Sequence, residues 1–381
     1  MRIRLFAAVL ISLVLPVIGS ATTWEIYPDG SGDAPTIQAG IDGAATGDSI
    51  LINAGTYYER LTLPVDRDEF TLVGVGLPVI DADRFGFILG LSQEGTVFEN
   101  LAFTQGHTYI GGVGTLSSRE IWFRNCEFYN NTANLEGGCF AILNGGIAHF
   151  ENCSFENNLA WGTGGGAIQV DEGGSIELEH CVFRGNHVVG ITGNDGGGAI
   201  HFRNTSSCSI RFCLFEENTT DYEAGAIRSY NSPVSLYSNT FLDNEARTAA
   251  GACVLNTSGP QVVLMKNIFV NNRDPVKAIY LEGSDLLFDI ECNDFWNHVE
   301  STVISPAWID TNGNFSLNPL FCDPDNGDFT LHADSPCVPG NHPDGYECGL
   351  IGAYDVGCGM AGVPNAMVQN TTWGQIKATY R

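Results

Sequence analysis

A motif of one aromatic and one amide residue, Phe-x-x-Asn, recurs along the middle of the chain. Its copies are Phe128/Asn131, Phe155/Asn158, Phe183/Asn186, Phe215/Asn218, Phe241/Asn244 and Phe269/Asn272, with a degenerate copy at Phe295/His298. The steps between successive Phe residues are 27, 28, 32, 26, 28 and 26 residues. A nearly constant period in the twenties is typical of a solenoid, in which each repeat forms one coil and packs on its neighbours.

Each period contains short stretches that favour strands and no helical periodicity. A Gly-Ala-Ile type segment follows most of these Phe residues, as at 166–168 and 198–200, and a third stretch alternates apolar and polar residues, as at 175–179. Three short strands per coil, separated by Gly, Asn or Ser turns, predict an all-β protein. The expected fold is a parallel β-helix of about ten three-strand coils, stacked ~4.8 Å apart.

This geometry assigns a place to each residue of the repeat. The Phe and Ile side chains are expected to point inward and stack on their equivalents in neighbouring coils. The Asn residues are expected at a bend, because Asn tolerates left-handed backbone and its amide can bond to the next coil. The glycines are expected to form a close turn into the following strand.

Strand alternation then predicts which side chains face outward after each Gly-Ala-Ile segment. Stacking places Gln169, His201 and Arg228 in one outward row, and Asp171, Arg203 and Tyr230 in the next row about 7 Å away. A polar, aromatic and cationic face of this kind could bind an acidic polysaccharide; the alternative is an ordinary solvated face. No catalytic set is evident. If the protein is an enzyme, His201 or Asp171 would act as the base, and Arg203 or Arg228 would neutralise a uronate.

Charge and the first residues narrow the cellular setting. The formal net charge is −27, so a nucleic acid is a poor partner. Two arginines precede an apolar run that ends in small residues, which predicts a secretory signal peptide over residues 1–21. No later stretch is apolar enough to span a bilayer. The expected product is a secreted or cell-surface monomer.

The 12 cysteines form two populations. Cys126, Cys153, Cys181 and Cys213 stand two residues before the repeated Phe, which predicts a stacked ladder of buried thiols; vertical disulfides are the alternative. Cys322, Cys337, Cys348 and Cys358 lie in a Pro/Gly/Asp-rich region and predict two disulfides with three possible connectivities. These disulfides would fasten a cap over the last coil, whose edge would otherwise be open.

No cofactor or metal is expected, with one alternative. Residues 323–328 read Asp-Pro-Asp-Asn-Gly-Asp and resemble a calcium loop, but the Glu required at the twelfth position is missing. Calcium at this loop is therefore the only metal to consider, and no Cys/His cluster has zinc spacing.

The repeat and the N-terminal region resemble known families. Residues 36–42, 47–52 and 55–59 resemble the start of the pectin-lyase-like, right-handed parallel β-helix superfamily, which implies a short N-terminal capping helix before the first coil. The paired Gly-Gly-Ala-Ile and Phe-x-x-Asn motifs resemble repeats of the chlamydial polymorphic outer membrane proteins. Both resemblances imply a fold more than a function, because this fold hosts lyases, hydrolases, adhesins and inert scaffolds. The residue sets of known pectin-degrading members are not evident in this sequence.

Together these patterns predict the organisation and a function. The expected parts are the signal peptide (1–21), the β-helix (22–313), a Cys-rich C-terminal coil and cap (314–358), and a linker with a tail (359–381). Residues 371–381 could be a recognition tag for export or surface attachment; the alternatives are a frayed end or a strand that docks on the rod. The expected function is non-catalytic, adhesin-like binding of a glycan or another surface. The alternatives are a polysaccharide lyase or glycoside hydrolase acting on acidic polysaccharide, and a purely structural spacer.

Overall fold

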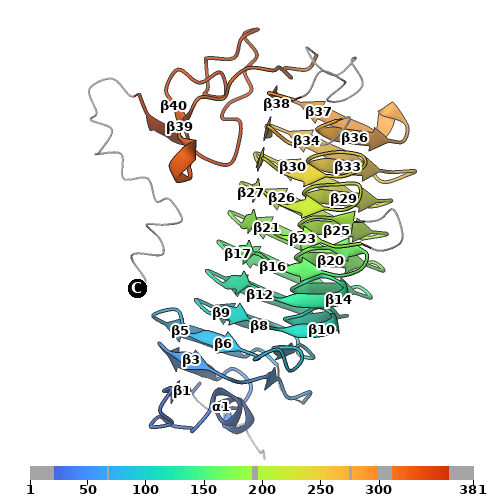
Figure 1. Ribbon diagram of the computed structural model, residues 1–381. Helices are drawn as coiled ribbons and strands as arrows, with labels where there is room; N and C mark the ends of the chain where they lie inside the picture. Colours follow the sequence, from blue (N-terminus) through green and yellow to red (C-terminus); the bar gives the residue numbers. More distant parts are fainter. Residues whose placement is uncertain (1–20, 67, 191–195, 274–276, 299–310, 360–381) are drawn as a thin grey trace, which may run out of the picture.

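The computed structural model describes residues 21–66, 68–190, 196–273, 277–298 and 311–359. These residues form a rod of stacked coils that rises from α1 (Ile37–Gly43) to β38 (Asp294–Trp296), with a further C-terminal part beside its upper half (Figure 1). The predicted signal peptide, except residue 21, and the predicted tail 371–381 lie outside the described residues. Among the described residues, no helix has the length and apolar character needed to cross a membrane.

Two long parallel sheets run the length of the rod. Sheet A has 11 strands: β1 (Thr23–Ile26), β2 (Ser49–Asn53), β5 (Thr71–Val75), β8 (Thr96–Glu99), β12 (Glu120–Arg124), β16 (Ile147–Glu151), β21 (Ser175–Glu179), β26 (Ser207–Arg211), β30 (Val234–Tyr237), β34 (Val262–Met265) and β37 (Phe288–Glu291). Sheet B has ten: β3 (Thr56–Tyr57), β6 (Val79–Asp81), β9 (Ala102–Thr104), β13 (Glu127–Tyr129), β17 (Ser154–Glu156), β22 (Val182–Arg184), β27 (Leu214–Glu216), β31 (Thr240–Leu242), β35 (Ile268–Val270) and β38.

Two further sheets complete most coils. Sheet C has six strands: β10 (His107–Ile110), β14 (Thr132–Glu136), β18 (Leu159–Ala160), β23 (His187–Val188), β28 (Thr219–Thr220) and β32 (Glu245–Ala246). Sheet D has seven: β11 (Gly114–Ser117), β15 (Phe140–Leu143), β20 (Ile168–Asp171), β25 (Ile200–Arg203), β29 (Ile227–Tyr230), β33 (Cys253–Asn256) and β36 (Ile279–Glu282). The pairs β4 (Leu61–Thr62)/β7 (Leu89–Gly90) and β19 (Gly164–Gly165)/β24 (Gly196–Gly197) are short, and η1 (Asp285–Leu287) precedes β37.

The parallel β-helix is therefore confirmed, with more elements than expected. Sheet A contributes one strand at each of 11 levels, against about ten predicted coils. The middle coils contain four strands rather than three, because the chain passes through sheet C between the Asn bend and the Gly-Ala-Ile segment. Helix α1 lies at the N-terminal end of the rod with Ile37 and Ile41 in the main core, and its role as a cap stays a prediction.

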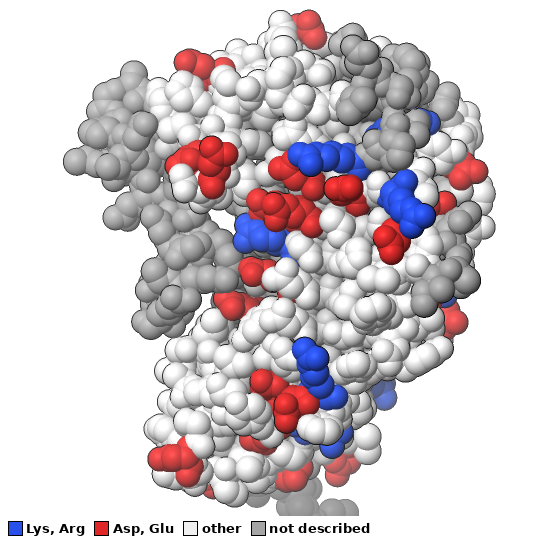
Figure 2. All heavy atoms as spheres, in the orientation of Figure 1, with Lys and Arg blue, Asp and Glu red and all other residues white. Residues whose placement is uncertain are grey.

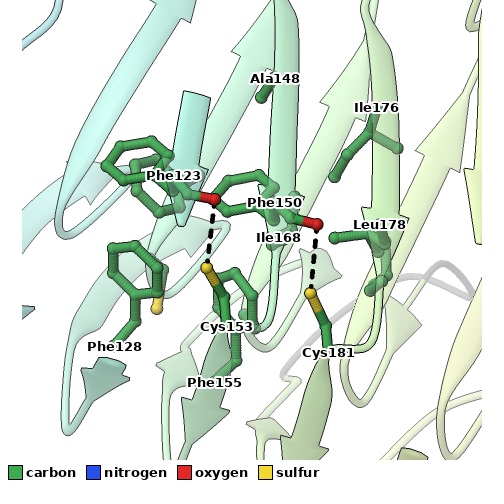
Figure 3. Packing of buried hydrophobic residues seen from close by; sticks show 14 of the residues in the cluster. Phe123, Phe128, Ala148, Phe150, Cys153, Phe155, Ile168, Ile176, Leu178 and Cys181 are labelled. Carbon is green, nitrogen blue, oxygen red and sulfur yellow. Dashed lines mark hydrogen bonds between the residues drawn. The ribbon is translucent and has the colours of Figure 1, made fainter. Parts of the chain in front are cut away.

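The core contains aromatic stacks along the rod axis beside aliphatic side chains, as the repeat predicts (Figure 3). The rings of Phe155 and Phe183 are parallel, with centroids 4.5 Å apart, and the same stack continues through Phe215, Phe241, Phe269 and Phe295. Because every ring contacts the ring above and below, no coil buries its aromatic face alone.

The predicted Asn ladder is present at the bend between sheets B and C. The side chain of Asn186 donates to the Phe155 carbonyl (2.8 Å) and to Asn218 Oδ1 (2.9 Å), and its own oxygen accepts from the backbone N–H of Asn158 (3.1 Å). This pattern repeats from Asn131 to Asn272, so the buried amides satisfy one another and the backbone of the neighbouring coils.

A second ladder occupies the bend between sheets A and B, where the four repeated cysteines are buried free thiols, as predicted. Cys153 Sγ donates to the Phe123 carbonyl (3.4 Å) and Cys181 Sγ to the Phe150 carbonyl (3.4 Å), as Figure 3 shows. In later coils Asn239 and Asn267 take over these positions and bond to the equivalent carbonyls. The thiol thus replaces the amide as donor to the preceding coil.

The C-terminal part corrects the predicted disulfides. The bonds are Cys292–Cys348 and Cys322–Cys358, whereas Cys337 is a buried free thiol. The first bond ties the C-terminal part to the residue after β37, so Cys292, which the sequence pattern did not select, replaces Cys337. The second bond closes a small sheet of β39 (Phe321–Asp323), β40 (Asp328–His332) and β41 (Val356–Cys358), with η2 (Pro324–Asn326) between the first two strands. Residues 316–359 are called the C-terminal segment below.

Candidate functional site

The face predicted to bind a ligand has the expected register on sheet D. Gln169, His201 and Arg228 are partners on neighbouring strands, and Asp171, Arg203 and Tyr230 form the adjacent row. Their predicted exposure, however, is wrong for four of the six. Gln169, Asp171, His201 and Arg228 are only 0%, 3%, 1% and 5% exposed, whereas Arg203 is partly exposed and Tyr230 is 44% exposed.

The burial has a local cause in the glycine-rich segments. Before entering sheet D, each of these coils runs back over the outer face of the sheet, through β19, β24 and residues 221–225. The backbone passes so close that a Cβ on Gly165 would lie 1.9 Å from the Ile168 carbonyl oxygen and 2.9 Å from the His201 nitrogen. Glycine is required at this contact. The glycine-rich segment therefore covers the row of Gln169, His201 and Arg228 and also turns the chain.

The covered groups balance their charges within the fold. Arg203 pairs with Asp171 and lies 3.9 Å from Glu136, and Arg228 pairs with Glu223 at 2.7 Å. Burial, reinforced by the nearby Arg228 and Arg203 charges, lowers the pKa of His201 to about 3. The residues selected for catalysis or glycan binding therefore form an enclosed polar layer, and only Arg203 and Tyr230 reach solvent. The role assigned to each residue stays a prediction.

A much larger opening lies on sheet B, where the C-terminal segment folds back beside the rod. It has a volume of about 1360 Å³ and is lined by strands β22, β27, β31, β35 and β38 on one side and by β39, η2 and β40 on the other. We call it the cleft. Five neighbouring strands span about 19 Å along the stack. Figure 2 shows the hollow between the rod and the C-terminal segment, with acidic side chains on both sides.

The cleft exists because the C-terminal segment covers part of sheet B. Apolar side chains on the outer face of sheet B, among them Val182, Leu214 and Ile268, pack against Phe329 and Leu331 of the segment. At the edge of this contact, Trp296, Phe321 and Tyr354 are partly buried and line the opening.

The floor of the cleft carries a charged cluster. Arg184 Nε donates to Glu216 Oε2 at 2.6 Å, and Arg184 Nη1 lies 4.0 Å from Glu156. Burial raises the pKa of Glu216 above its usual range, although the Arg184 charge opposes this. Burial likewise raises the pKa of Asp243, on the next coil, against the opposing charge of Arg273. These two carboxyl groups hold a proton at higher pH than a solvated carboxyl group does.

The sequence patterns did not reveal this site, although a signal was present. The two residues between Phe and Asn in each Phe-x-x-Asn motif face away from the core at this bend. In chain order, the first of these positions is Tyr129, Glu156, Arg184, Glu216, Leu242, Val270 and Trp296. The sequence could therefore indicate the floor of the cleft. It could not indicate the covering segment, which comes from a distant part of the chain.

A smaller depression of about 180 Å³ lies on the outer face of sheet A. Here the Trp122 indole is parallel to the His149 ring, with centroids 4.9 Å apart. The two His149 nitrogens lie 2.7 Å from Glu120 and 3.0 Å from Glu177. The polar groups of this cluster satisfy one another, so the cleft is the stronger candidate for ligand binding.

No metal centre emerges from the described part of the chain, where no group of three or more His, Cys, Asp or Glu side chains is placed to hold an ion. In the loop that resembles a calcium site, Asp323 accepts from Asn326 (2.8 Å) and Asp328 accepts from the Thr330 backbone (3.1 Å). The absence of a cofactor stays a prediction.

Comparison with known proteins identifies the fold family. The family model described as "Right handed beta helix region" matches residues 81–197 and 111–295, which together span more than half of the chain. The chain therefore belongs to the right-handed β-helix family. A search of curated proteins gave no match.

Among solved structures, the chain is similar to polysaccharide lyases at low identity. A rhamnogalacturonan lyase aligns at 13% identity over 72% of this chain and 87% of its own, with a TM-score of 0.39. A PL6 alginate lyase in complex with a trisaccharide aligns at 15% identity over 84% of this chain and 66% of its own, with a TM-score of 0.41. A PL6 lyase from Pseudopedobacter saltans aligns at 12% identity over 87% and 93%, with a TM-score of 0.25.

Proposed function

We propose that this protein binds a glycan chain in the cleft between sheet B and the C-terminal segment. The observation that carries the proposal is a cleft of about 1360 Å³ whose lining combines three aromatic residues, Trp296, Phe321 and Tyr354, with the Arg184–Glu216 pair. Partly buried aromatic rings combined with a few fixed polar groups are the usual composition of a ligand site. The cleft follows the stack for about 19 Å, a shape that suits an extended chain better than a single sugar.

The site in this proposal differs from the one the sequence indicated. The enclosed row of Gln169, His201 and Arg228 offers no surface to a polymer, so the binding role moves to the outer face of sheet B. The remaining sequence predictions are carried forward as part of the proposal: export through the signal peptide, a location outside the cell or on its surface, a monomeric state, and an adhesin-like role comparable to the polymorphic outer membrane protein repeats.

Hydrolysis of a glycosidic bond is the second candidate, and one observation favours it. Glu216 and Asp243 lie on adjacent coils in the cleft, and burial raises both pKa values. A carboxyl group that keeps its proton can act as a general acid, and a second carboxylate nearby can act as a base or nucleophile. The alternative of a lyase reaction would need a base next to a bound uronate.

The binding test uses an array of neutral, anionic and cationic polysaccharides with the wild-type protein and Trp296→Ala. We expect retention on at least one glycan and a loss of about tenfold or more in affinity for the variant, because an aromatic contact in a cleft is a typical hot spot. Trp161→Ala is the matched control, since Trp161 is 48% exposed and is not part of the cleft lining. The proposal is contradicted if all three proteins are retained equally, or if none of them is retained on any glycan.

Turnover is measured on the same array by new reducing ends and by the absorbance of unsaturated uronates. Hydrolysis that is lost in Glu216→Gln and Asp243→Asn while binding is retained would establish the second candidate. Binding without products from the wild-type protein would leave the non-catalytic role.

A further inference from the structure

We propose that the cleft selects a cationic glycan, a chain of amino sugars with free amino groups, over neutral and anionic ones. This inference rests on the proposed function and adds the chemical class of its ligand. The observation behind it is an imbalance of charge across a cleft that is also lined by aromatic rings.

The charges that line the cleft are mostly negative. The acidic lining residues are Glu216, Glu217 and Asp243 on the rod and Asp325, Asp328 and Asp334 on the C-terminal segment. Among the described residues of the lining, the only Lys or Arg is Arg184. Carboxylates on two facing walls reinforce each other's field in the space between them, and a narrow low-dielectric opening focuses it.

The single guanidinium does not provide a site for an anion. Arg184 bonds to Glu216 at 2.6 Å and lies 4.0 Å from Glu156, so two carboxylates already offset its charge. A uronate entering the cleft would have to displace Glu216 from Arg184 and would meet the remaining carboxylates. An anionic polymer is therefore disfavoured, in contrast to the expectation from the sequence.

The aromatic rings supply a second, independent reason. Trp296, Phe321 and Tyr354 each line the same space as the carboxylates. The face of an aromatic ring attracts an ammonium group, most strongly for Trp. A sugar that carries an ammonium group can thus contact a ring and a carboxylate at once, whereas an N-acetylated sugar has no charge for either of them to attract.

The buried carboxyl groups couple ligand binding to proton release. Glu216 and Asp243 are partly buried, and burial works against their charged forms. An ammonium group placed beside them would favour the charged forms and lower both pKa values. At a pH where Glu216 and Asp243 still hold part of their protons, binding of a cationic chain should therefore expel protons, and binding of a neutral chain should not.

The direct test is calorimetry at low salt with four probes of equal length. They are a glucosamine oligomer, its permanently charged N-trimethyl form, its fully N-acetylated form and an oligogalacturonate. We expect both cationic probes to bind at least about tenfold more tightly than the acetylated one, with an affinity that falls as salt screens the field. The N-trimethyl probe should release protons, measured by repeating the titration in buffers of different ionisation enthalpy.

The matched variants remove charge inside and outside the cleft. Glu217→Gln/Asp325→Asn neutralises two exposed lining residues, and Glu172→Gln/Glu245→Gln neutralises two exposed residues elsewhere. We expect the first variant to lose roughly fivefold to tenfold in affinity for the N-trimethyl probe and the second to lose almost none. In the first variant, binding of the acetylated probe should fall by a smaller factor than binding of the N-trimethyl probe.

The outcomes separate this inference from the proposed function. If the acetylated probe binds as tightly as the cationic ones, or if the oligogalacturonate binds best, the inference is overturned while a glycan-binding cleft remains. If none of the probes binds, the inference is overturned, and the proposed function is contradicted only if the polysaccharide array also gives no retention. A wild-type preference for cations that survives equally in both double variants would also overturn the inference, because the charge would then act from outside the cleft.

Discussion

At the scale of single residues, two buried side chains, Asp294 and His201, have pKa values that are strongly shifted but still within reach of a pH titration. They lie in different parts of the fold. Asp294, the first residue of β38, is fully buried against the C-terminal segment, where Oδ1 accepts from the Leu317 N–H (3.1 Å) and Oδ2 accepts from the Cys337 thiol (3.4 Å). Burial raises its pKa to about 8. His201 lies in the enclosed layer on sheet D, where burial lowers its pKa to about 3. Both groups are held neutral, so they destabilise the fold at opposite ends of the pH scale.

The Asp294 effect predicts a loss of stability with rising pH. The folded-state pKa of about 8 lies above the usual 3.8, so its contribution is complete below about pH 4 and is lost progressively as pH rises to about 8. Asp294→Asn should remove this dependence and stabilise the protein above pH ~8, by on the order of 5 kcal/mol. Urea unfolding at a series of pH values measures it. Asp289→Asn on β37 is the control, and an unchanged pH dependence in D294N would contradict the assignment.

The His201 effect has the opposite direction. Its folded-state pKa of about 3 lies below the usual 6.5, so its contribution is complete above about pH 6.5 and is lost as pH falls toward about 3. His201→Gln places in β25 the residue that β20 already has at the paired position, Gln169. We expect the variant to keep its melting temperature down to a lower pH than the wild type does. Thermal unfolding at a series of pH values between neutral and acidic measures this. Identical acid sensitivity in both proteins would show that His201 is already protonated or solvated in the fold.

At the scale of elements, the repeat determines local structure because the same contact recurs in every coil. The Phe stack, the Asn ladder and the thiol ladder could all be predicted from the sequence, since each needs only a period and an inward direction. The path through sheet C and the cover over sheet D could not. The glycines that make the cover possible look like turn residues, and nothing local in the sequence distinguishes a turn from a backbone that lies flat on the next sheet.

The close approach of the glycines can be tested by adding one methyl group. In Gly166→Ala the new Cβ would lie 2.0 Å from the Gly198 carbonyl oxygen and 2.8 Å from the His187 nitrogen, and both contacts are backbone. We expect a loss of stability of several kcal/mol or a failure to fold. Gly259→Ala is the matched control, because a Cβ at this position would have no atom within 4 Å and the φ angle of Gly259 is not positive.

A denaturant titration of the two glycine variants compares them with the wild type. G259A should unfold near the wild-type midpoint, whereas G166A should unfold far earlier. Equal midpoints for G166A and G259A would mean that the glycine-rich segment does not pack closely on the backbone of the next coil at Gly198 and His187.

At the scale of the whole molecule, the cleft depends on contacts between distant parts of the chain. The Ala353 N–H donates to Thr240 Oγ1 across 113 residues of sequence, and Cys292 bonds to Cys348 across 56. Such pairings leave no periodic trace, which explains why the sequence predicted two disulfides but selected Cys337 in place of Cys292. The outward row of the Phe-x-x-Asn motifs could be predicted, but its conversion into one wall of a cleft could not.

Because one wall of the cleft is the C-terminal segment, we predict that the Cys322–Cys358 disulfide supports ligand binding more than it supports the stability of the rod. In Cys322→Ser/Cys358→Ser the sheet of β39, β40 and β41 loses its covalent link, at a cost of about 2–4 kcal/mol for that segment. Hydrogen exchange should rise in residues 321–358 and stay low in sheet A, and affinity for a glycan ligand should fall. Protected exchange in the segment together with unchanged binding would contradict this division of roles.

The most direct test of the glycan-binding cleft is a crystal structure of the protein with the oligosaccharide that binds best on the array. We expect sugar rings between Trp296 and the C-terminal segment, with polar contacts to the Arg184–Glu216 pair or to the neighbouring carboxylates. An oligosaccharide seated on the outer face of sheet A near Trp122, or on the exposed Tyr230 edge of sheet D, with the cleft unoccupied, would contradict it.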